Sequence, residues 1–533
     1  MIRKVEWAVA LVATAALVGL HAVFLAHAGG LWRDEANSVG LATLPSPSEI
    51  WANLQFDSFP ALWFVALRSW IAAGLGASDL GLRALGLIVG LGVLGVLWRS
   101  GRRTGASPPL VALALIGFNS TVIVYGDSVR GYGLGVLTGL LAIGELWLVA
   151  DEPTPRRVLV AALAAVASVQ CLFQNALLLF AACSGGAVVS LRRRLPGRAV
   201  TILGIGAASA LSLLPYRGAI RSASEWNDIL RYDIDLSWIG FRLRQALEET
   251  GPHSPLAWSL LCLLAVVGPC AVLARRGNAV PERERDLGWF SITTLLVGSL
   301  SYLLFVRTLR YAMQPWYFLT WMVLGAWCIE VAFTLVARSA GGRISRLGVA
   351  VFLMALAFAP VWRSVHSRRT DLDLVAAEIE RAAREGDIVV LCPWYYGVTF
   401  WRYYRGNAEW LTIPPVSFHR YHRQDLLKRL MESEDAIRPV LEKMEKALCG
   451  GNRVFWVGLA KAPPAGTAAP VLPAAPHPVW GWSDMPYYEA WGLQAGQLLL
   501  HARRWEPVPL PLRQPVSEYE SPPLYVFEGW RAP

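Results

Sequence analysis

The sequence predicts a polytopic α-helical membrane protein that carries an α/β domain outside the membrane at its C-terminal end. Three observations lead to this prediction. The 533 residues are 55% hydrophobic and only 17% charged, whereas soluble proteins are about 25% charged. Apolar runs recur over the first two-thirds of the chain, many of them close to the roughly 18 residues that a membrane span needs. Short arginine clusters separate these runs, as in loops on the cytoplasmic side of a membrane.

The apolar runs predict about eleven transmembrane helices. Arg3 and Lys4 precede the first run, which is longer than the roughly 7–15 apolar residues of a signal peptide, so we expect it to be retained. Arginine clusters at alternate loops put the N-terminus inside and, for an odd number of spans, the C-terminus outside. The predicted helices cover residues 5–27, 79–98, 108–125, 131–150, 157–170, 171–190, 199–215, 254–274, 289–306, 311–337 and 347–362.

Two long segments are predicted to lie on the outer face, residues 28–78 and 216–253. Inside the first, the apolar stretch 59–76 contains Arg68. If this stretch crossed the membrane, every later arginine cluster would lie on the wrong side. We therefore expect an interfacial or re-entrant helix there.

The chain changes character after about residue 363. An amphipathic stretch is followed by a Gly-Asp turn and a short apolar run at 388–391, and further apolar runs follow at 453–459 and 524–530. Short apolar runs bounded by turn residues predict buried strands. The chain thus divides into a transmembrane domain, residues 1–362, and an extracytoplasmic α/β domain, residues 363–533.

Several other interpretations are excluded or left open by the sequence. The net charge of +10 does not indicate nucleic-acid binding, because the arginines sit in loops between apolar runs. The GxGxxG match at Gly90–Gly95 lies inside an apolar run with no preceding strand, so it favours close helix packing over a dinucleotide site. The seven cysteines show no metal-binding spacing. An oxidising compartment would permit a disulfide between Cys392 and Cys449.

Charged residues from distant parts of the chain are predicted to gather at the outer membrane face. Charge at membrane depth is expensive unless it is paired or hydrated, so such residues are functional candidates. Ion pairs that merely anchor the interface, Arg33 with Asp34 and Asp127 with Arg130, are the alternative. The predicted set is Arg33, Asp34, Glu35, Asp57, Asp127, Arg130, Arg217, Arg221, Arg307 and Arg310.

Such a set suits transfer of a sugar from a lipid phosphate. A carboxylate can take the proton from an acceptor hydroxyl. Nearby arginines can hold the phosphate that leaves with negative charge. A lipid-linked phosphosugar keeps its tail in the bilayer and its phosphate at the headgroup level, so no nucleotide is needed on that face.

The stretch WRDEANSVGLA, followed by FDSFPALWFVALRSWI, resembles the first outer loop of the GT-C membrane glycosyltransferases. The resemblance is to the branch with the protein O-mannosyltransferases and the lipid A aminoarabinose transferases. DSVRGYGL and RYAMQPW resemble two further segments of that branch. Three departures stand out: Trp63 in a Tyr position, Asp127 in place of Glu or Gln, and Phe173–Asn175 near the place of a frequent His.

The resemblance implies a role for each matched residue. Asp34 is the general base on the acceptor, Glu35 orients the acceptor or substrate, and Asp57 shapes the site. Where a relative uses a divalent ion, Asp34 and Asp57 are its ligands, and that ion is the one cofactor left open. Arg130 and Arg310 bind the lipid phosphate, and Arg307 and Arg217, predicted at the same outer face, are further candidate phosphate ligands. The substrate-shaping residues are Arg33, Asp127, Tyr132 and Tyr311.

The expected function is therefore transfer of a hexose or pentose from a polyprenyl-phosphate-linked donor to a hydroxyl of an extracytoplasmic lipid, glycan or protein. The resemblance implies inversion at the anomeric carbon, without a covalent enzyme intermediate. The expected location is the inner (plasma) membrane of a bacterium, as a multi-pass protein whose C-terminal domain faces the periplasm or exterior. Membrane lipids are expected partners, and nucleic acids are not.

Alternative functions stay open. A transporter or lipid-linked sugar flippase would also carry charge in the membrane, but it typically shows broken helices in related halves, and the sequence has no such repeat. A non-catalytic envelope-assembly subunit could keep the same fold, although the intact Asp34-Glu35 pair argues against it. An intramembrane protease would need HExxH or GxSxG in a span, and neither motif occurs.

Overall fold

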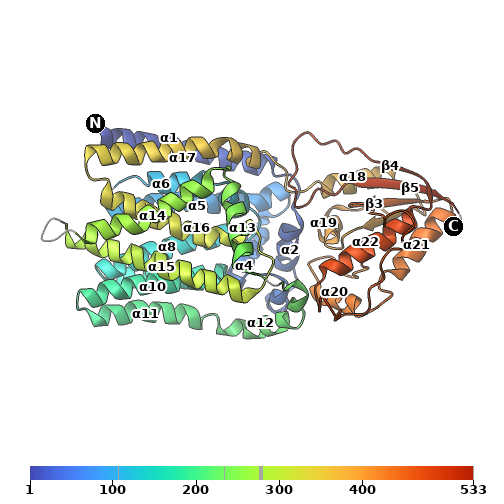
Figure 1. Cartoon of the computed structure of the whole chain (residues 1–533), viewed down its shortest axis with the longest axis horizontal. Helices are drawn as coiled ribbons and strands as arrows, with labels where there is room; N and C mark the ends of the chain where they lie inside the picture. The colour runs from blue at the N-terminus through green and yellow to red at the C-terminus, as the bar shows by residue number, and fades with distance from the viewer. Residues whose placement is uncertain (106, 233, 275–279, 532–533) are drawn as a thin grey trace. The chain divides into compact units, whose positions relative to one another are not determined.

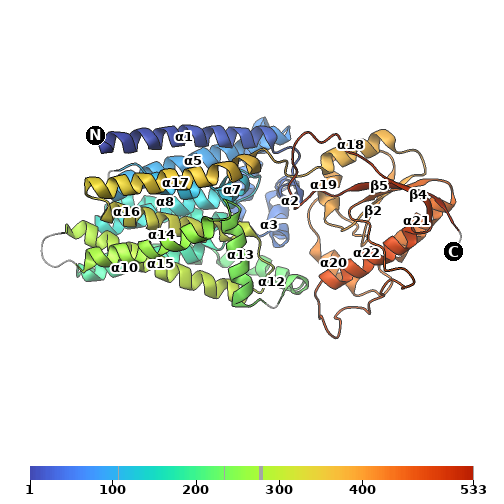
Figure 2. The ribbon, with the colours of Figure 1, turned by 45° about the horizontal axis from the view of Figure 1, so that its top comes forward.

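The computed structural model describes residues 1–105, 107–232, 234–274 and 280–531. The chain forms two compact units, one helical and one of mixed α/β type (Figures 1 and 2). The helical unit comprises Met1–His27, Ser58–Arg217 and Asp233–His366. The α/β unit comprises Ala28–Asp57, Gly218–Tyr232 and Ser367–Pro533.

Long apolar helices dominate the helical unit. They are α1 Ile2–His27, α5 Asp79–Gly105, α8 Tyr132–Asp151, α9 Pro155–Cys171, α10 Asn175–Arg192, α11 Pro196–Leu211, α14 Ser254–Leu273, α15 Glu282–Leu309, α16 Leu319–Val336 and α17 Ala340–Val365. The shorter elements are α4 Ala61–Trp70, η2 Ile71–Leu75, α6 Leu110–Ala112, η3 Leu113–Gly117, α7 Ser120–Gly126, η4 Leu214–Tyr216, α13 Leu236–Glu248 and η7 Pro315–Phe318.

Within the described residues, nine helical segments are long and apolar enough to cross a membrane. Each coincides with a predicted span, so the multi-pass membrane fold is confirmed. The other two predicted spans differ. Residues 108–125 form a broken helix, in which Asn119 accepts from the Val122 amide and starts α7 anew, and α9 has only 17 residues. The count of eleven and the orientation stay predictions.

The stretch predicted to lie along the interface, residues 59–76, forms α4 and its π-helical extension η2. The 15 residues of Ala61–Leu75 measure about 22 Å as a helix, less than the roughly 30 Å of a hydrocarbon core. Gly74, with φ of 81°, ends the helix. The stretch is too short to span, in agreement with the prediction.

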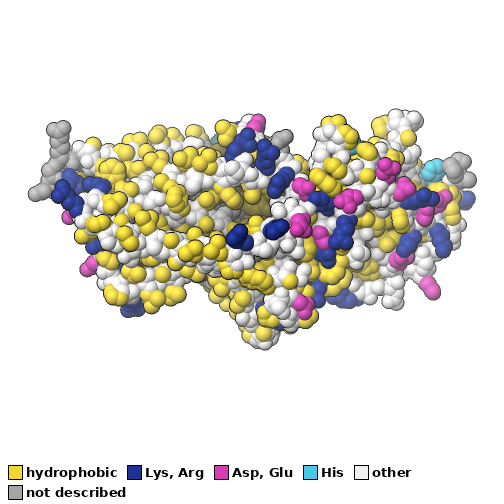
Figure 3. All heavy atoms as spheres, turned by 90° about the horizontal axis from the view of Figure 1, so that it is seen from below, with side chains coloured by type: hydrophobic (Ala, Val, Ile, Leu, Met, Phe, Trp, Pro, Cys, Tyr) yellow, Lys and Arg dark blue, Asp and Glu magenta, His cyan; other side chains and the backbone are white. Residues whose placement is uncertain are grey.

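The outer surface of the helical unit is apolar where lipid would contact it (Figure 3). On α14 the side chains of Leu256, Leu260, Leu263 and Val267 are all exposed. Their spacing of three and four residues puts them on one face of the helix. By contrast, nearly every side chain of α16 is buried, so α16 lies in the interior of the bundle.

The α/β unit begins with helices from the first outer segment. Its elements are α2 Arg33–Ala42, α3 Pro47–Asn53, η1 Leu54–Phe56, α12 Arg217–Ser224, η5 Asn227–Leu230, α18 Leu372–Ala382, β1 Ile388–Leu391, α19 Tyr396–Tyr403, β2 Glu409–Thr412, α20 Gln424–Met431, α21 Arg438–Cys449, β3 Arg453–Val457, α22 Met485–Leu499, β4 Ala502–Pro507 and β5 Leu524–Trp530.

The five strands form one sheet in the order β2-β1-β3-β5-β4. Strands β2, β1 and β3 are parallel, while β5 runs antiparallel to both β3 and β4. The predicted strands at 388–391, 453–459 and 524–530 are thus the three central ones. Both edge strands were missed.

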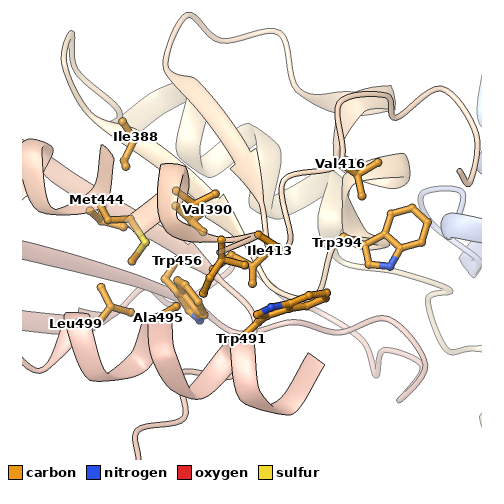
Figure 4. Close-up of a cluster of buried hydrophobic side chains, with 14 of the residues drawn as sticks. Ile388, Val390, Trp394, Ile413, Val416, Met444, Trp456, Trp491, Ala495 and Leu499 are labelled. Atoms are coloured by element: carbon orange, nitrogen blue, oxygen red, sulfur yellow. The ribbon is translucent and has the colours of Figure 1, made fainter. Parts of the chain in front are cut away.

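Both faces of this sheet are covered. Side chains alternate along a strand, so Ile388 and Val390 face one side and join Trp456, Met444 of α21 and Leu499 of α22 (Figure 4). A second cluster on the other side joins Val389, Leu391 and Phe455 to α18 and α19. Burial on both faces explains why β1 is a continuous apolar run.

Cys392 and Cys449 are both thiols in this structure. Cys392 follows the carboxyl end of β1, whereas Cys449 precedes the amino end of β3. Because β1 and β3 are parallel, the two cysteines lie beyond opposite ends of these strands, and the four residues from Ile388 to Cys392 alone span about 13 Å at about 3.3 Å per residue. A disulfide needs Cα atoms within about 7 Å, so these two do not bridge.

Candidate active site

The predicted acids of the first outer segment lie at the start of α2. Asp34 and Glu35 occupy its first turn, where a negative charge interacts favourably with the helix dipole. Glu35 is fully buried, and its Oε2 accepts a hydrogen bond from the Trp32 amide at 3.3 Å. Glu35 therefore stabilises the start of the helix, while Asp34 keeps 23% of its side chain exposed.

Two cationic or titratable side chains flank Asp34. His422 Nε2 lies 3.8 Å from Asp34 Oδ1, and Arg33 Nε lies 3.9 Å from the same oxygen. Both distances exceed a hydrogen bond but lie within the range of an ion pair, so Arg33 pairs with Asp34 without a hydrogen bond. The result is an accessible carboxylate beside an imidazole.

A polar network joins Asp57 to this group. Asn37 and Ser38 follow Asp34 by three and four residues, so all three share one face of α2. Asp57 Oδ2 accepts from Asn37 Nδ2 at 2.9 Å and from Ser38 Oγ at 3.2 Å. Asn37 Oδ1 in turn accepts from the His422 amide at 2.7 Å. Asn37 thus links the Asp57 carboxylate to the backbone of His422.

Arg33 is held from two sides. Its Nη1 donates to the Tyr519 carbonyl at 2.6 Å. Its guanidinium lies 4.7 Å from the ring centroid of Tyr395 and 5.4 Å from that of Trp32, within the range of a cation–π interaction. Arg33 is therefore a positioned cation next to Asp34.

A buried acid, Glu520, accepts a hydrogen bond from the backbone of Arg33. Glu520 accepts from the Arg33 amide at 3.0 Å and from the Thr399 hydroxyl at 3.0 Å. Burial raises the pKa of Glu520 from 4.5 to about 8. The folded chain therefore keeps a proton on Glu520 that the unfolded chain releases.

This proton makes stability depend on pH. Between the unfolded pKa of 4.5 and the folded pKa of about 8, the folded state binds one proton more than the unfolded state. The free energy of unfolding is therefore highest below this pH range and falls as pH rises through it. We expect the wild-type thermal midpoint to fall from about pH 5 to about pH 8 and Glu520→Gln to flatten this dependence. Thermal unfolding followed by intrinsic fluorescence measures it; an equal slope in both proteins would contradict the assignment.

Asp34 and the residues around it lie at the carboxyl ends of the parallel strands. Tyr395 follows β1 by four residues, the loop to His422 follows β2, and Glu520 shortly precedes β5, which begins at the same edge because it is antiparallel to β3. Ligands of open α/β sheets bind in the crevice outside the carboxyl ends of parallel strands. The first outer segment therefore brings Asp34 to the edge where such sheets bind ligands.

Close packing of α2 depends on Gly40. A Cβ at this position would lie 2.0 Å from the carbonyl oxygen of Arg420, and a backbone atom cannot move aside easily. Gly40→Ala is expected to destabilise the docking of α2 by about 1–3 kcal/mol. Hydrogen exchange of residues 33–42, read by mass spectrometry, should become faster. Gly218→Ala, in open space on α12, is the control and should leave this exchange unchanged.

The helical unit brings its own motif residues together. The Arg130 guanidinium lies 4.5 Å from the centroid of the Phe59 ring and 6.0 Å from that of Tyr132. The Tyr125 and Trp316 rings, which belong to the segments around Asp127 and Arg310, lie 4.4 Å apart. Three segments that resemble the same family thus converge within this unit.

The remaining predicted arginines of the helical unit are exposed. Arg217 follows Tyr216, whose hydroxyl accepts from the Ala61 amide at 3.0 Å, so it lies near the start of α4. Arg307 is on the last turn of α15, and Arg310 ends this helix with φ of 51°. Tyr311 follows, half-buried. Whether these arginines share one pocket with Asp34 stays a prediction.

Asp127 does not anchor Arg130 as the alternative interpretation proposed. Its Oδ2 lies 2.6 Å from His21 Nδ1 of α1, and both side chains are buried.

Sequence reasoning missed His21, although an isolated His in an apolar span was a signal. Asn37 and Ser38 were detectable from their spacing to Asp34, whereas His422 lies 385 residues from Asn37 and had no sequence signal.

The stretch Phe173–Asn175 forms the break between α9 and α10. Asn175 Nδ2 donates to Ser168 Oγ at 2.9 Å and to the Gly135 carbonyl at 2.9 Å. Its Oδ1 accepts from Thr320 at 3.0 Å. Asn175 therefore satisfies backbone and side-chain groups inside the bundle.

The predicted metal ligands Asp34 and Asp57 belong to the polar group at α2. In the part of the chain that the structure describes, no three His, Cys, Asp or Glu side chains gather closely enough to hold a metal ion. Asp57 Oδ2 is already engaged by two donors. The metal role of Asp34 and Asp57 stays a prediction.

Comparison with known proteins gives similarity at the level of solved structures. No family model matches the chain, and no curated protein does. The crystal structure of ArnT from Cupriavidus metallidurans bound to undecaprenyl phosphate matches with a TM-score of 0.47 and 13% identity over 85% of this chain and 92% of that one. The same protein in the apo state gives a TM-score of 0.33, with 13% identity over 85% and 93%.

A cryo-EM structure of the arabinosyltransferase EmbB from Mycobacterium smegmatis matches with a TM-score of 0.38 and 15% identity over 65% of this chain and 33% of that one. These are similarities to membrane glycosyltransferases, the kind of protein that the sequence resembles. Because all TM-scores lie below 0.5, they add no argument about substrate or activity.

Proposed function

We propose that this protein is a membrane glycosyltransferase that transfers a sugar from a polyprenyl-phosphate-linked donor to an acceptor hydroxyl with inversion. The observation that carries the proposal is the Asp34 carboxylate. It is part-exposed at the start of a helix, with His422 and Arg33 within 4 Å, at the ligand-binding edge of the sheet. An acid with a purely structural role, such as Glu35, is buried, whereas Asp34 stays accessible.

Asp34 acts as the general base. The acceptor hydroxyl gives its proton to the Asp34 carboxylate while its oxygen bonds to the anomeric carbon. The bond from that carbon to the phosphate oxygen breaks, and the polyprenyl phosphate leaves with the electron pair. One displacement inverts the anomeric centre. Arg33 and His422 stabilise the negative charge of Asp34 from within 4 Å, and Asp57 acts through Asn37 and Ser38 as a positioning residue.

Arginines of the helical unit stabilise the departing phosphate. Arg310, Arg307 and Arg217 are exposed at helix ends, and guanidinium groups bind phosphate in a bidentate way. Arg130 is buried against Phe59 and Tyr132, so it orders the segment that carries it. Arginines in such positions stabilise charge that develops in the transition state.

The test uses the purified full chain with a synthetic short-chain polyprenyl-phosphate sugar and a mixture of envelope lipids and glycans as acceptors. The expected result is release of the polyprenyl phosphate coupled to a sugar-sized mass gain on an acceptor, with the opposite anomeric configuration by NMR. Movement of the intact donor across sealed vesicles without cleavage would contradict the proposal and favour a flippase. Retained configuration would contradict the single displacement.

A further inference from the structure

A cavity of about 600 Å³ lies inside the helical unit, where several of its helices end. Its wall comes from the last turn of α5, the α8–α9 turn, the start of α15 and the α16–α17 turn. Seven arginines and three acids line it. They are Arg102, Arg103, Arg157, Arg283, Arg338, Arg343 and Arg346, with Asp151, Glu152 and Glu284.

The three acids are already paired within the wall. Arg283 Nε lies 2.7 Å from Asp151 Oδ2, and Arg157 Nη1 lies 2.9 Å from Glu152 Oε2. Arg338 pairs with Glu284. Three arginines thus neutralise the three acids of the wall, which leaves Arg102, Arg103, Arg343 and Arg346.

Two of those four arginines are held by acids behind the wall. Arg346 is only 3% exposed; its Nη2 lies 2.5 Å from Glu330, and its Nη1 lies 3.5 Å from Glu6. Arg343 Nη1 lies 3.2 Å from Glu6 as well. Within the described part of the chain, Arg346 Nε has no hydrogen-bond partner. The two glutamates thus hold Arg346 and Arg343 in place in the wall of the cavity.

Arg102 and Arg103 line the cavity without an acid in an ion pair among the described residues. The Arg102 guanidinium lies 5.9 Å from the centroid of the Trp7 ring, and the side chains of Arg102 and Arg103 are exposed. They add positive charge that nothing in the described wall balances. The usual excess of arginine in cytoplasmic loops of membrane proteins accounts for exposed cations. It does not account for a cavity with a buried guanidinium in its wall.

We propose that this cavity binds a phosphate group. Guanidinium groups match phosphate in a bidentate geometry, and several of them from different helices surround one volume. The volume lies in the range of about 300–1,000 Å³ that small-ligand sites occupy. Because the apolar stretches of these helices end here, the cavity lies at the depth of lipid headgroups. The phosphate belongs either to an anionic phospholipid or to a free compound such as pyrophosphate.

The test compares two double variants of the full chain. Arg102→Gln/Arg103→Gln removes the two lining arginines that form no ion pair with an acid among the described residues. Arg156→Gln/Arg194→Gln removes two exposed arginines that start α9 and follow α10 and do not line the cavity. Both change the charge equally, so general attraction of anions affects both alike.

Binding is measured in two arms. In nanodiscs of phosphatidylcholine with added phosphatidylglycerol, native mass spectrometry counts bound phosphatidylglycerol. In nanodiscs of phosphatidylcholine alone, calorimetry measures binding of inorganic pyrophosphate. The cavity variant is expected to lose affinity about tenfold in at least one arm, which corresponds to about 1.4 kcal/mol, while the control changes by less than about twofold. The arm that responds identifies the source of the phosphate.

Three results would overturn the proposal: no change in the cavity variant, equal loss in both variants, or no binding to wild type in either arm. Thermal midpoints of both variants establish that the fold is intact. Arg102→Lys/Arg103→Lys keeps the charge but loses the planar fork, and partial loss in this variant supports guanidinium recognition. None of these readouts uses sugar transfer, so they are independent of the proposed function.

Discussion

Replacing Asp34 by Asn is expected to lower kcat for sugar transfer by about 10²–10⁴-fold, the usual contribution of a general base. Asparagine keeps the size of the side chain and its position on α2, but it cannot take the proton of the acceptor hydroxyl. KM should change little, because donor binding rests on other residues. The measurement is release of polyprenyl phosphate at saturating donor.

Glu49→Gln is the matched control for Asp34. Glu49 is an exposed acid in the same outer segment, on α3, and it contacts Ser46. This variant should retain wild-type turnover. Asp34→Asn with unchanged kcat would remove Asp34 from the chemistry. A loss that is equal in both variants would indicate a general charge effect.

Replacing Arg310 by Gly is expected to lower kcat/KM by about tenfold to a hundredfold without loss of stability. Arg310 holds a left-handed backbone conformation at the end of α15, with φ of 51°. This conformation costs a residue with a Cβ roughly 1–2 kcal/mol, and glycine adopts it freely. The substitution thus separates the loss of the guanidinium from any loss of fold. Initial rates over a range of donor concentrations and a thermal midpoint measure both effects.

Arg194→Gly is the control for this prediction. Arg194 follows α10 in the same backbone conformation, with φ of 56°, and is likewise exposed. It lies outside the motif segments, so its replacement should leave kcat/KM unchanged while the stability stays equal or rises. If Arg310→Gly left activity intact, a role of Arg310 in phosphate binding would be excluded. A lower thermal midpoint in both variants would contradict the stability argument.

The membrane helices were predictable because each is specified by its own composition. The leucines of α14 are exposed on its surface, and a helix that satisfies its own backbone hydrogen bonds needs no partner to be recognised. The departures have local causes. Asn119 restarts a helix inside the predicted span at 108–125, and α9 is one residue shorter than the shortest of the nine long spans.

The sheet was predictable only in its centre. Strands buried on both faces need apolar residues at every position, which marks β1 and β3. The edge strands have partly exposed side chains: β4 exposes five of its six residues, and β2 has a single buried one. Their sequences carry little apolar pattern, because an edge strand is defined by its hydrogen-bonded neighbour rather than by burial.

The sequence by itself determined the membrane class and the central strands, since composition and apolar runs are properties of contiguous residues, and a local motif is enough to propose Asp34. Only the tertiary structure decided that Glu35 is buried as a helix-capping residue, that Asn37 links Asp57 to His422, and that residues 28–57 pack with residues 367–533. The Asn37–His422 hydrogen bond and the packing of the two segments depend on contacts between residues hundreds of positions apart. Such contacts follow from the packing of the whole unit and leave no local pattern along the chain.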